Sequence, residues 1–358
     1  MLTIKELHIQ GFKKVIEATD PETKLHCIIA IHNTDLGPAL GGARIRSYHD
    51  KEEALQDVLR LSRAMTYKSA VAESGLGGGK SVLIAQPSDK SEKLLLSFGK
   101  VVDSLKGDYI VAEDIGTSPE DMAIIRRATP YVAALVNEKS SGDPSRFTAW
   151  GVYRGIQAVA KTLWGSPSLA NKVIALQGLG SVGGKLANIL FWEGAQLILS
   201  DIDEKKLHNQ ALLYGAQTIP ADNFNSAQCD ILSPCALGGI INDETIAKMR
   251  CKAVAGGANN QLLLPSHGRK LMEKGILYAP DYIINSGGII NAAAEFDPNG
   301  YNPVVARDKV NHLYDILLQV FDIAKKENRP TSDIADDLAE YNLLHGVGKR
   351  AVPINFRR

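Results

Sequence analysis

Apolar runs and amphipathic segments alternate along the first part of the chain, a pattern that predicts an α/β unit. Residues 27–31 and the segment around Arg44 predict two strands joined by the Gly/Pro-rich loop 37–42. The remaining elements of this part are strands at 81–85 and 109–112, a helix at 92–105, and a helix that Ser118 and Pro119 open.

A second alternation of strands and helices begins at Lys172. Strands 173–177 and 196–200 and helices 182–193 and 204–214 follow one another at the spacing of parallel βαβ units. Further short apolar runs continue this parallel sheet to about residue 285.

Two long helical patterns, 308–326 and 333–344, close the chain. Between the two alternations lies the Gly-, Ser- and Pro-containing stretch 140–145, after which a long helical pattern begins at Thr148. We therefore place a domain boundary between residues 147 and 148.

Length, charge and cysteine usage narrow the class of protein. The chain has 358 residues, enough for two cores, and its 40 basic and 40 acidic side chains give a net charge of +0, so we expect no nucleic-acid partner. No apolar run approaches the ~20 residues that span a bilayer, and the charged start does not resemble a secretion signal. We expect a cytoplasmic protein without membrane association, with four free thiols and no metal site.

The most specific motif is a glycine fingerprint between a predicted strand and a predicted helix: Gly178, Leu179, Gly180, Ser181, Val182 and Gly183. Such glycines permit a tight turn, close approach of the backbone to a pyrophosphate, and packing of helix on strand. Asp201 follows the next strand, where an acidic side chain binds ribose hydroxyls and repels a 2′-phosphate. We predict a Rossmann-type site for NAD, although Lys205 and Lys206 lie nearby and a simple glycine turn is the alternative.

A second glycine cluster, Gly77–Gly79, precedes Lys80. The segment resembles the end of a phosphate-binding loop, but Ser74 stands where that motif requires a glycine. We predict a glycine turn that brings backbone and substrate close to Lys80. The alternative is an ordinary turn with a solvated lysine.

Lys68 extends the apolar stripe of a helix that begins with the capping-box-like pair Asp50 and Glu53. A buried amine requires an anion, whereas a lysine at a helix end can also reach the solvent. Lys68 and Lys80 would suit a carboxylate clamp and an amine base, each lowering the pKa of the other. The stripe runs through Ala54, Val58, Leu61 and Met65.

Polar residues follow several predicted strands. Asp114 comes after the strand 109–112, at the edge where open α/β sheets bind ligands. Asn259 and Asn285 lie in Gly-rich turns of the second part and would offer amide groups to a nicotinamide or a substrate. Asparagine and aspartate also favour turns for conformational reasons, so a purely structural role remains the alternative for all three.

These motifs, in this order, resemble the family of amino acid dehydrogenases that deaminate leucine, valine or phenylalanine with NAD, relatives of glutamate dehydrogenase. The resemblance covers nearly the whole chain, although the segment 289–294 is richer in alanine than is usual and the tail from Val347 is unfamiliar. The matching segments are 37–42, 65–68, 77–80, 112–114, the glycine fingerprint, 234–238, 258–261 and 279–282.

The resemblance implies roles for individual residues. Lys68 would bind the carboxylate of the amino acid, Lys80 would be the catalytic lysine acting through water, and Asp114 would relay protons. Asn259 would touch the substrate, and Thr148 the nicotinamide amide. Further substrate contacts would come from Leu40, Gly41, Met65, Ala112, Ile289 and Ala292, and further cofactor contacts from the fingerprint, Asp201, Cys235, Ala236 and Asn285.

The resemblance also implies the architecture. Residues 1–147 would form an α/β domain for substrate binding, catalysis and oligomerisation, which the C-terminal helix 331–358 rejoins. Residues 148–330 would form the Rossmann-type domain, with the active-site cleft between the two domains. The assembly would be a homo-octamer.

The expected reaction is reversible oxidative deamination of leucine, valine or isoleucine. The positions that would line the side-chain pocket, Leu40, Ala112, Ile289 and Ala292, carry no charge, which excludes a glutamate-like substrate. Glu113 beside Asp114 favours the leucine enzymes, whereas the small Ala292 leaves room for phenylalanine or tryptophan. A catalytically silent NAD-binding protein is a further alternative, which the presence of both lysines disfavours.

Overall fold

The computed structural model describes residues 1–135 and 141–356, and the chain packs as two units. The packing divides the chain between Asp143 and Pro144, whereas the boundary predicted from the sequence lies between 147 and 148, after the linker 140–145, whose first residue, Ser140, lies outside the described residues. The packing also places the segment 292–303 in unit 1. Unit 1 contains Met1–Asp143, Ala292–Pro303 and Ala339–Arg358, and unit 2 contains Pro144–Asn291 and Val304–Leu338.

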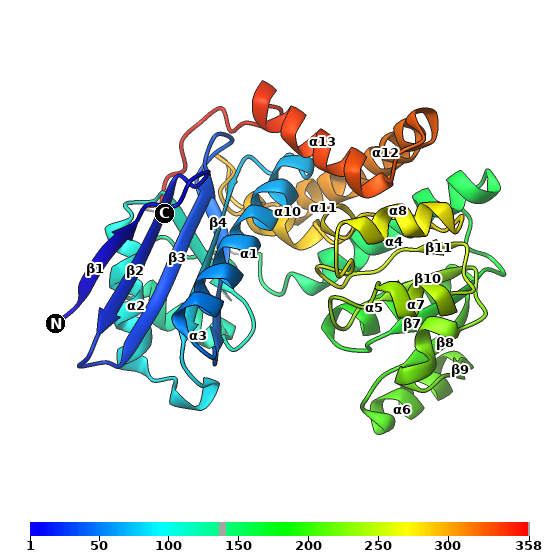
Figure 1. Ribbon diagram of the computed structural model, residues 1–358, viewed down its shortest axis with the longest axis horizontal. Helices are drawn as coiled ribbons and strands as arrows, with labels where there is room; N and C mark the ends of the chain where they lie inside the picture. The colour runs from blue at the N-terminus through cyan, green and yellow to red at the C-terminus, as the bar shows by residue number, and fades with distance from the viewer. Residues whose placement is uncertain (136–140, 357–358) are drawn as a thin grey trace. The chain divides into compact units, whose positions relative to one another are not determined.

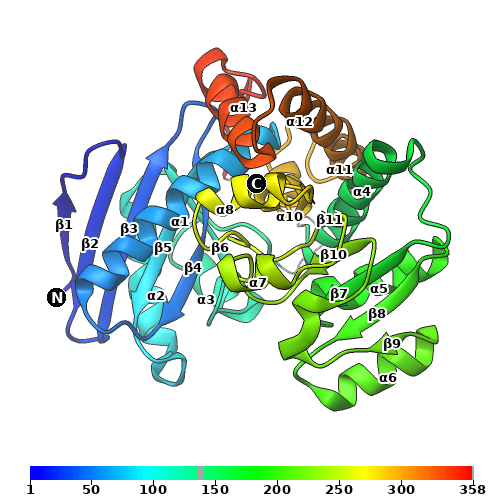
Figure 2. The same ribbon diagram turned by 45° about the vertical axis from the view of Figure 1, so that its right-hand side comes forward.

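Unit 1 is built on a mixed sheet (Figure 1) in the order β1-β2-β3-β5-β4-β6, with β5 and β6 labelled in Figure 2. Neighbouring strands from β1 to β5 run antiparallel, while β4 is parallel to both β5 and β6. The strands are β1 Thr3–Leu7, β2 Lys14–Asp20, β3 Leu25–Asn33, β4 Ala39–Arg46, β5 Gly77–Ile84 and β6 Tyr109–Glu113.

The sequence analysis did not predict β1 and β2, which extend the sheet beyond β3. All but the last residue of β1 is exposed, so this edge strand has no apolar alternation to reveal it. In β2, the buried residues Val15, Ile16 and Ala18 are flanked by charged ones.

Helices cover both faces of this sheet (Figures 1 and 2). The helix α1, Lys51–Val71, packs Ala54 and Val58 against one face, while α2, Glu92–Ser104, and α3, Pro119–Arg126, pack against the other. The predicted helix starts are confirmed, because the Asp50 and Ser118 side chains accept hydrogen bonds from backbone N–H groups in the first turns of α1 and α3. The short 3₁₀ helix η1, Pro87–Asp89, precedes α2.

The glycines before Lys80 lie in a strand, so the predicted glycine turn is wrong. They form the start of β5, between β3 and β4 in the middle of the sheet. Glycine is required because neighbouring groups crowd the strand: a Cβ on Gly78 would lie 2.0 Å from the backbone nitrogen of Thr66, and one on Gly79 would lie 2.8 Å from the Tyr109 ring. As a result, α1 packs directly on the backbone of β5.

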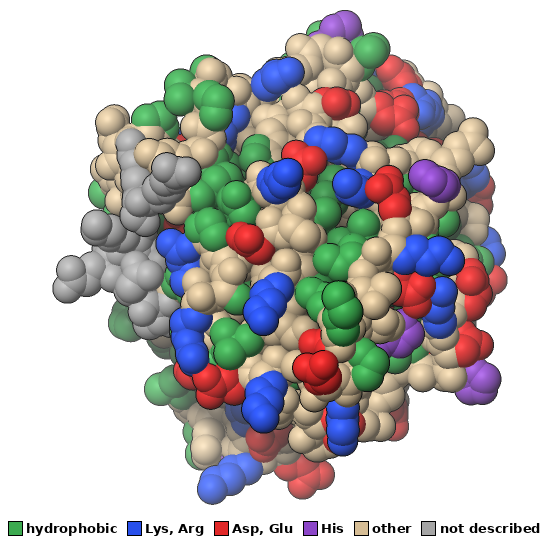
Figure 3. All heavy atoms as spheres, turned by 90° about the vertical axis from the view of Figure 1, so that its left-hand side faces the viewer, with side chains coloured by type: hydrophobic (Ala, Val, Ile, Leu, Met, Phe, Trp, Pro, Cys, Tyr) green, Lys and Arg blue, Asp and Glu red, His purple; other side chains and the backbone are tan. Residues whose placement is uncertain are grey.

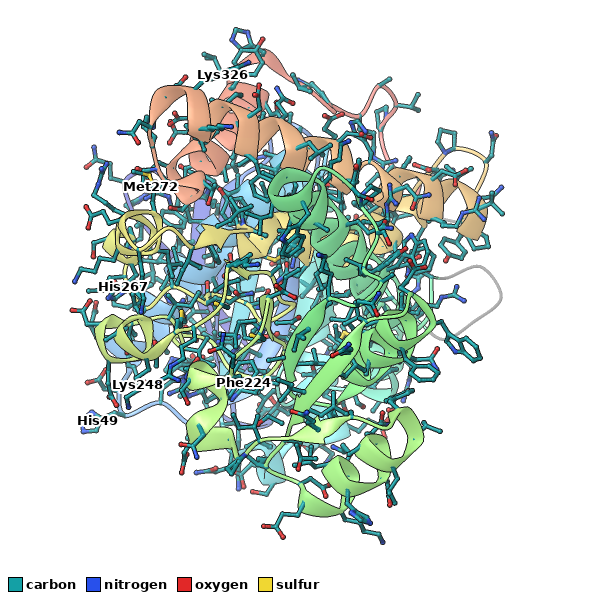
Figure 4. All side chains as sticks on the ribbon, turned by 90° about the vertical axis from the view of Figure 1, so that its right-hand side faces the viewer. His49, Phe224, Lys248, His267, Met272 and Lys326 are labelled. Atoms are coloured by element: carbon teal, nitrogen blue, oxygen red, sulfur yellow. The ribbon has the colours of Figure 1, made fainter. Side chains whose placement is uncertain are left out.

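Unit 2 contains a parallel sheet in the order β12-β11-β10-β7-β8-β9, which confirms the predicted Rossmann-type domain. Phe224, labelled in Figure 4, is fully buried in the core beside this sheet. The strands are β7 Val173–Gln177, β8 Gln196–Ser200, β9 Gln217–Thr218, β10 Ile231–Pro234, β11 Ala253–Val254 and β12 Leu277–Tyr278.

The helices of unit 2 largely match the predicted segments. The single helix predicted at 308–326 is instead divided, because the His312 N–H donates to the Lys309 carbonyl three residues back and ends the first helix. His267, also labelled in Figure 4, lies 3.2 Å from Asp243 and links α8 to α7. The helices from residue 144 onward are α4 Ser145–Trp164, α5 Ser181–Trp192, α6 Glu204–Tyr214, η2 Ala221–Ser226, α7 Asp243–Lys248, α8 Ser266–Glu273, α9 Asp281–Ile284, α10 Gly287–Ala294, α11 Pro303–Asn311, α12 Leu313–Glu327 and α13 Thr331–His345.

The C-terminal segment is bound to unit 1 through Arg350. Its guanidinium donates hydrogen bonds to the carbonyl oxygens of Gly75 (3.3 Å), Phe296 (2.6 Å) and Ala293 (3.1 Å). The Arg350 backbone N–H also donates to the Leu36 carbonyl at 3.1 Å. The Arg350 side chain therefore connects its own segment, 339–358, to the segments 1–143 and 292–303 of unit 1.

The face shown in Figure 3 carries side chains of both charges intermingled with apolar ones. Within residues 1–135 and 141–356, no helix combines the length and the apolar character needed to cross a membrane. All four cysteines are free, with Cys27 and Cys229 buried and Cys235 and Cys251 half-buried, as the sequence predicted.

We expect Arg350→Ala to lower the free energy of unfolding of unit 1 by about 3 kcal/mol, because buried carbonyl groups lose charged hydrogen-bond donors. Urea unfolding followed by far-ultraviolet circular dichroism measures this change in free energy. Tryptophan fluorescence would not report on unit 1, because the three tryptophans, Trp150, Trp164 and Trp192, all lie in unit 2. The neighbouring substitution Lys349→Ala, at an exposed position, is the control. Equal midpoints for the two variants would show that Arg350 contributes little.

Candidate active site

Lys80 and Asp114 form a buried ion pair in unit 1. Lys80 lies in β5, Asp114 directly follows β6, and the Nζ–Oδ2 distance is 2.9 Å. The Lys80 side chain is only 7% exposed, so its ammonium group has exchanged nearly all of its water for this carboxylate. The structure thus brings together two residues that were selected from the sequence for separate reasons.

Arg44, on β4, approaches the same carboxylate. Its Nε donates to Asp114 Oδ2 at 2.8 Å, and its Nη1 donates to Asp57 Oδ2 at 3.0 Å. Asp57, on α1, also accepts hydrogen bonds from the hydroxyl group of Tyr48 (2.9 Å) and from the guanidinium of Arg60 (2.9 Å). A continuous chain of charged groups therefore runs from α1 to Lys80.

The surroundings shift the pKa values of both members of the pair. Burial is the largest influence on Lys80 and lowers its pKa below that of an ordinary lysine; Asp114 opposes this effect and Arg44 adds to it. Burial alone would raise the pKa of Asp114, but its two cationic neighbours outweigh burial and hold that pKa below its usual value. Arg44 is a cation that acts on Lys80 and that the sequence did not suggest; the mutual lowering of the pKa values of Lys68 and Lys80 stays a prediction.

Two glycines of β4 leave the space that this pair occupies. A Cβ on Gly42 would lie 2.7 Å from the Asp114 Cβ and 3.2 Å from the Lys80 Nζ, and one on Gly41 would lie 1.9 Å from the Gly79 carbonyl oxygen. Any side chain at these positions would push the strands or the ion pair apart.

Lys68 lies in the last turn of α1 and is half-buried. The predicted apolar stripe is correct as far as Leu61, but Met65 and Lys68 are half-buried and the buried face continues through small polar residues. The close contact of Thr66 with the glycine strand explains this change, because only small side chains fit there. The buried residues of this part are Ser62, Thr66, Ser69, Ala70 and Val71.

The other expected substrate contacts lie on several elements. Leu40 and Gly41 are buried in β4, Ala112 is half-buried in β6, and Met65 is half-buried in α1, all within unit 1. Ile289 and Ala292 lie on α10 and are each 6% exposed. Their contact with a substrate stays a prediction.

The glycine fingerprint of unit 2 has the geometry that its sequence predicts. Gly178 has a φ of +86°, and a Cβ on Gly183 would lie 1.8 Å from the Gly178 carbonyl oxygen. Gly180 caps α5 at its N-terminus, with no other group within 4 Å of its Cβ position. These features fit a dinucleotide whose pyrophosphate approaches the start of a helix.

Asp201 follows β8 and turns back onto the fingerprint. Its Oδ2 accepts a hydrogen bond from the Leu179 N–H at 2.6 Å, and its Oδ1 accepts one from the Asp203 N–H at 2.9 Å. The carboxylate is thereby fixed beside the glycine turn, where an adenosine ribose binds in Rossmann-type domains.

The turns after the strands of unit 2 are joined by hydrogen bonds. The Asn285 side chain donates to Asn259 Oδ1 at 2.8 Å and to the Gly257 carbonyl at 3.2 Å, and the Gly257 N–H lies 3.3 Å from the Cys235 sulfur. Ala236 lies against the fingerprint, 2.9 Å from the Cβ position of Gly178. Four of the predicted residues thus share one edge of the sheet.

Cys235 and Thr148 have structural contacts of their own in unit 2. Burial raises the pKa of the Cys235 thiol to about 11, so the thiol stays protonated and does not act as a nucleophile. Thr148, in the first turn of α4, donates to the Pro144 carbonyl and lies 2.7 Å from the Cβ position of Gly288.

Comparison with known proteins identifies the chain. The model of the "Glu/Leu/Phe/Val dehydrogenase, dimerisation domain" matches residues 12–131, and that of "Glutamate/Leucine/Phenylalanine/Valine dehydrogenase" matches residues 196–330. A leucine dehydrogenase of Geobacillus stearothermophilus is 48% identical over 95% of this chain and 93% of its own length. The chain belongs to the Glu/Leu/Phe/Val dehydrogenase family.

Other members of the family are also similar to this chain. A phenylalanine dehydrogenase of Caldalkalibacillus thermarum (strain TA2.A1) is 45% identical over 96% of this chain and 94% of its own length. The crystal structure of an L-tryptophan dehydrogenase from Nostoc punctiforme superimposes with a TM-score of 0.82 and 41% identity, over 94% of this chain and 97% of that one.

Membership of the Glu/Leu/Phe/Val dehydrogenase family makes this chain an amino acid dehydrogenase, an oxidoreductase of a class that generally depends on pyridine nucleotides. The match of the dimerisation domain to residues 12–131 indicates self-association through unit 1. The expected fold class is confirmed as well.

Neither Arg44 nor Asp57 is among the site residues predicted from the sequence of this amino acid dehydrogenase. Both carried a signal: Asp57 has the helical spacing of the buried Ala54 and Leu61, and Arg44 shares one face of its strand with Leu40 and Gly42. A charged residue on a buried face requires a partner, and each of these two supplies the partner of the other.

We expect Gly180→Ala to weaken NADH binding at least tenfold without lowering thermal stability, because the added methyl group meets no protein atom and blocks only the approach of the pyrophosphate. Gly183→Ala is the matched comparison, since its methyl group clashes with Gly178 and should lower both binding and stability. Fluorescence titration with NADH and thermal denaturation measure the two effects. Undiminished affinity in Gly180→Ala would contradict the dinucleotide assignment.

Proposed function

We propose that this amino acid dehydrogenase catalyses the reversible, NAD-dependent oxidative deamination of leucine, valine and isoleucine to the 2-oxo acids and ammonia. The observation that carries the proposal is the buried Lys80–Asp114 pair. A lysine with a lowered pKa can supply a free amine as a general base at mildly alkaline pH.

Three residues of unit 1, Lys68, Lys80 and Asp114, have distinct tasks in this reaction. Lys68 binds the α-carboxylate of the amino acid as a point charge. Oxidation of the α-carbon gives an iminium ion. A water molecule attacks the carbon of this iminium ion, and Lys80 in its amine form accepts a proton from that water molecule. Asp114, which accepts a hydrogen bond from Lys80, exchanges protons with that lysine as the resulting carbinolamine releases ammonia.

Unit 2 would hold the cofactor through the fingerprint, Asp201 and the turn that carries Asn285, while Asn259 would touch the substrate. A bound NAD supplies the acceptor for the hydride that leaves the α-carbon. Asp201 favours NAD over NADP, because its fixed carboxylate would repel a 2′-phosphate. Of the lysines nearby, Lys206 has an acidic neighbour of its own, Asp203, with 3.9 Å between Nζ and Oδ2.

An aliphatic side chain is the favoured substrate feature. The uncharged residues Leu40, Ala112, Ile289 and Ala292 would surround it, and the leucine dehydrogenase of Geobacillus stearothermophilus is slightly more similar to this chain than the two enzymes for aromatic amino acids are. The small Ala292 supports phenylalanine or tryptophan as a second candidate. For the assembly we propose a homo-octamer, for which the dimerisation domain in unit 1 gives support.

Lys80→Ala should lower kcat for leucine at least 100-fold while NADH binding is retained, because general-base catalysis is lost and the cofactor residues lie in unit 2. Lys100→Ala removes an amine from an exposed position on α2 and serves as the control. NADH formation at 340 nm measures turnover. More than a tenth of wild-type kcat in Lys80→Ala would refute the assignment of the base.

The substrate class is tested by kcat/KM for leucine, phenylalanine and tryptophan. We expect the highest value for leucine, and we expect Ala292→Val to raise the ratio of leucine to either aromatic acid about tenfold by reducing the room beyond the α-carbon. Because the ratio is measured within one variant, differences in active enzyme concentration cancel. A higher wild-type value for an aromatic acid would overturn the aliphatic assignment.

A further inference from the structure

We propose that Arg44 is a positioning residue for this reaction: it holds the Asp114 carboxylate in place while Lys80 gains and loses its proton, and Asp57 fixes Arg44 in turn. The inference rests on the proposed role of Lys80 as the base. It concerns residues that do not themselves need to touch the substrate.

The geometry shows two cations on one carboxylate oxygen. Arg44 Nε and Lys80 Nζ lie 2.8 Å and 2.9 Å from Asp114 Oδ2. An arginine does not release its proton in proteins, whereas a buried lysine does so readily. When Lys80 is in the amine form, Arg44 therefore still neutralises Asp114 and keeps its orientation.

Without Arg44, the buried carboxylate of Asp114 would depend on Lys80 for charge compensation. Leaving a buried charge unpaired is costly, so Asp114 would retain the proton on Lys80 and reduce the fraction of free amine. With Arg44 in place, deprotonation of Lys80 leaves an ion pair intact. This is the property that a base needs if it cycles between two protonation states at every turnover.

Asp57 anchors the other end of the guanidinium. Its side chain is 11% exposed, and Oδ2 accepts hydrogen bonds from both Arg44 and the hydroxyl group of Tyr48. Burial, followed by the nearby Asp57, raises the pKa of Tyr48 well above its usual value, so this hydroxyl stays a donor. The two carboxylates hold Arg44 from opposite sides, one on α1 and one after β6.

The charged groups that act on Lys80 come from three neighbouring elements. They are Asp114 after β6, Arg44 on β4 and Asp57 on α1, which also carries Lys68. The residue paired with Lys80 on β3 is Ala30, which is uncharged. Arg44 disfavours the protonated lysine and Asp57 favours it, so removing each charge should move the titration of Lys80 in opposite directions.

The test is the pH dependence of kcat/KM for leucine in the full-length enzyme. Activity should rise with pH as Lys80 becomes the free amine. Arg44→Gln should move this rise by about one pH unit to higher pH, and Asp57→Asn should move it to lower pH. Arg44→Lys keeps a cation that can itself lose its proton, so this variant should restore the wild-type profile only in part. Arg46→Gln removes the same charge from the same strand at a half-exposed position paired with Glu53, and should leave the profile unchanged.

A purely structural role predicts a different result. In that case Arg44→Gln would lower the melting temperature and kcat without moving the pH profile, and Asp57→Asn would do the same, which would overturn the proposal. If Arg44→Gln does not fold, the proposal is still tested by the shift of the Asp57→Asn profile to lower pH and by the pH profile of Arg44→Lys. If Lys80→Ala keeps its activity, the proposed base fails, which is a separate outcome from an unmoved profile in the Arg44 variants.

Discussion

A buried ammonium group must keep an anion beside it, and much of unit 1 is arranged around this requirement. Lys80 lies in the middle of a sheet, and its partner Asp114 reaches it from the end of β6, the strand beyond β4. The space for the two side chains comes from a position without one, Gly42, whose Cβ would touch both. Gly42 thus serves charge burial, whereas the glycines of the adjacent strand β5 make room for Thr66 and Tyr109.

The Rossmann-type unit could be predicted in detail because its signals are local. Strand, glycine turn, helix, second strand and acidic residue follow one another within about 30 residues, and Gly178 and Asp201 lie where that order requires. The caps at Asp50 and Ser118 are equally local, and both are present in the structure. Lys80 and Asp114 were also identified from the sequence, although nothing in the sequence showed that they pair.

The features that sequence missed depend on contacts between distant segments. The run Gly77–Gly79 has the composition of a turn, and only the approach of Thr66 and Tyr109 shows why a central strand needs glycine there. In the sequence, Arg44 is one charged residue in a predicted strand. Only the fold brings it into contact with Asp57 on a helix and with Asp114 after another strand. The edge strand β1 is exposed along most of its length, so burial left no pattern in its sequence.

The way in which Arg350 closes unit 1 has a consequence for biosynthesis. The segments 292–303 and 339–358 belong to the same unit as the first 143 residues, and Arg350 lies in the later of these two segments. A ribosome delivers residues in order and domains fold as they emerge. The N-terminal part of unit 1 is therefore made before the segment that packs against it at Gly75, and residues 144–338, most of which belong to unit 2, are made between the two. The lysine-bearing unit is thus closed by a segment that is made after all the strands of its sheet and after the whole of unit 2.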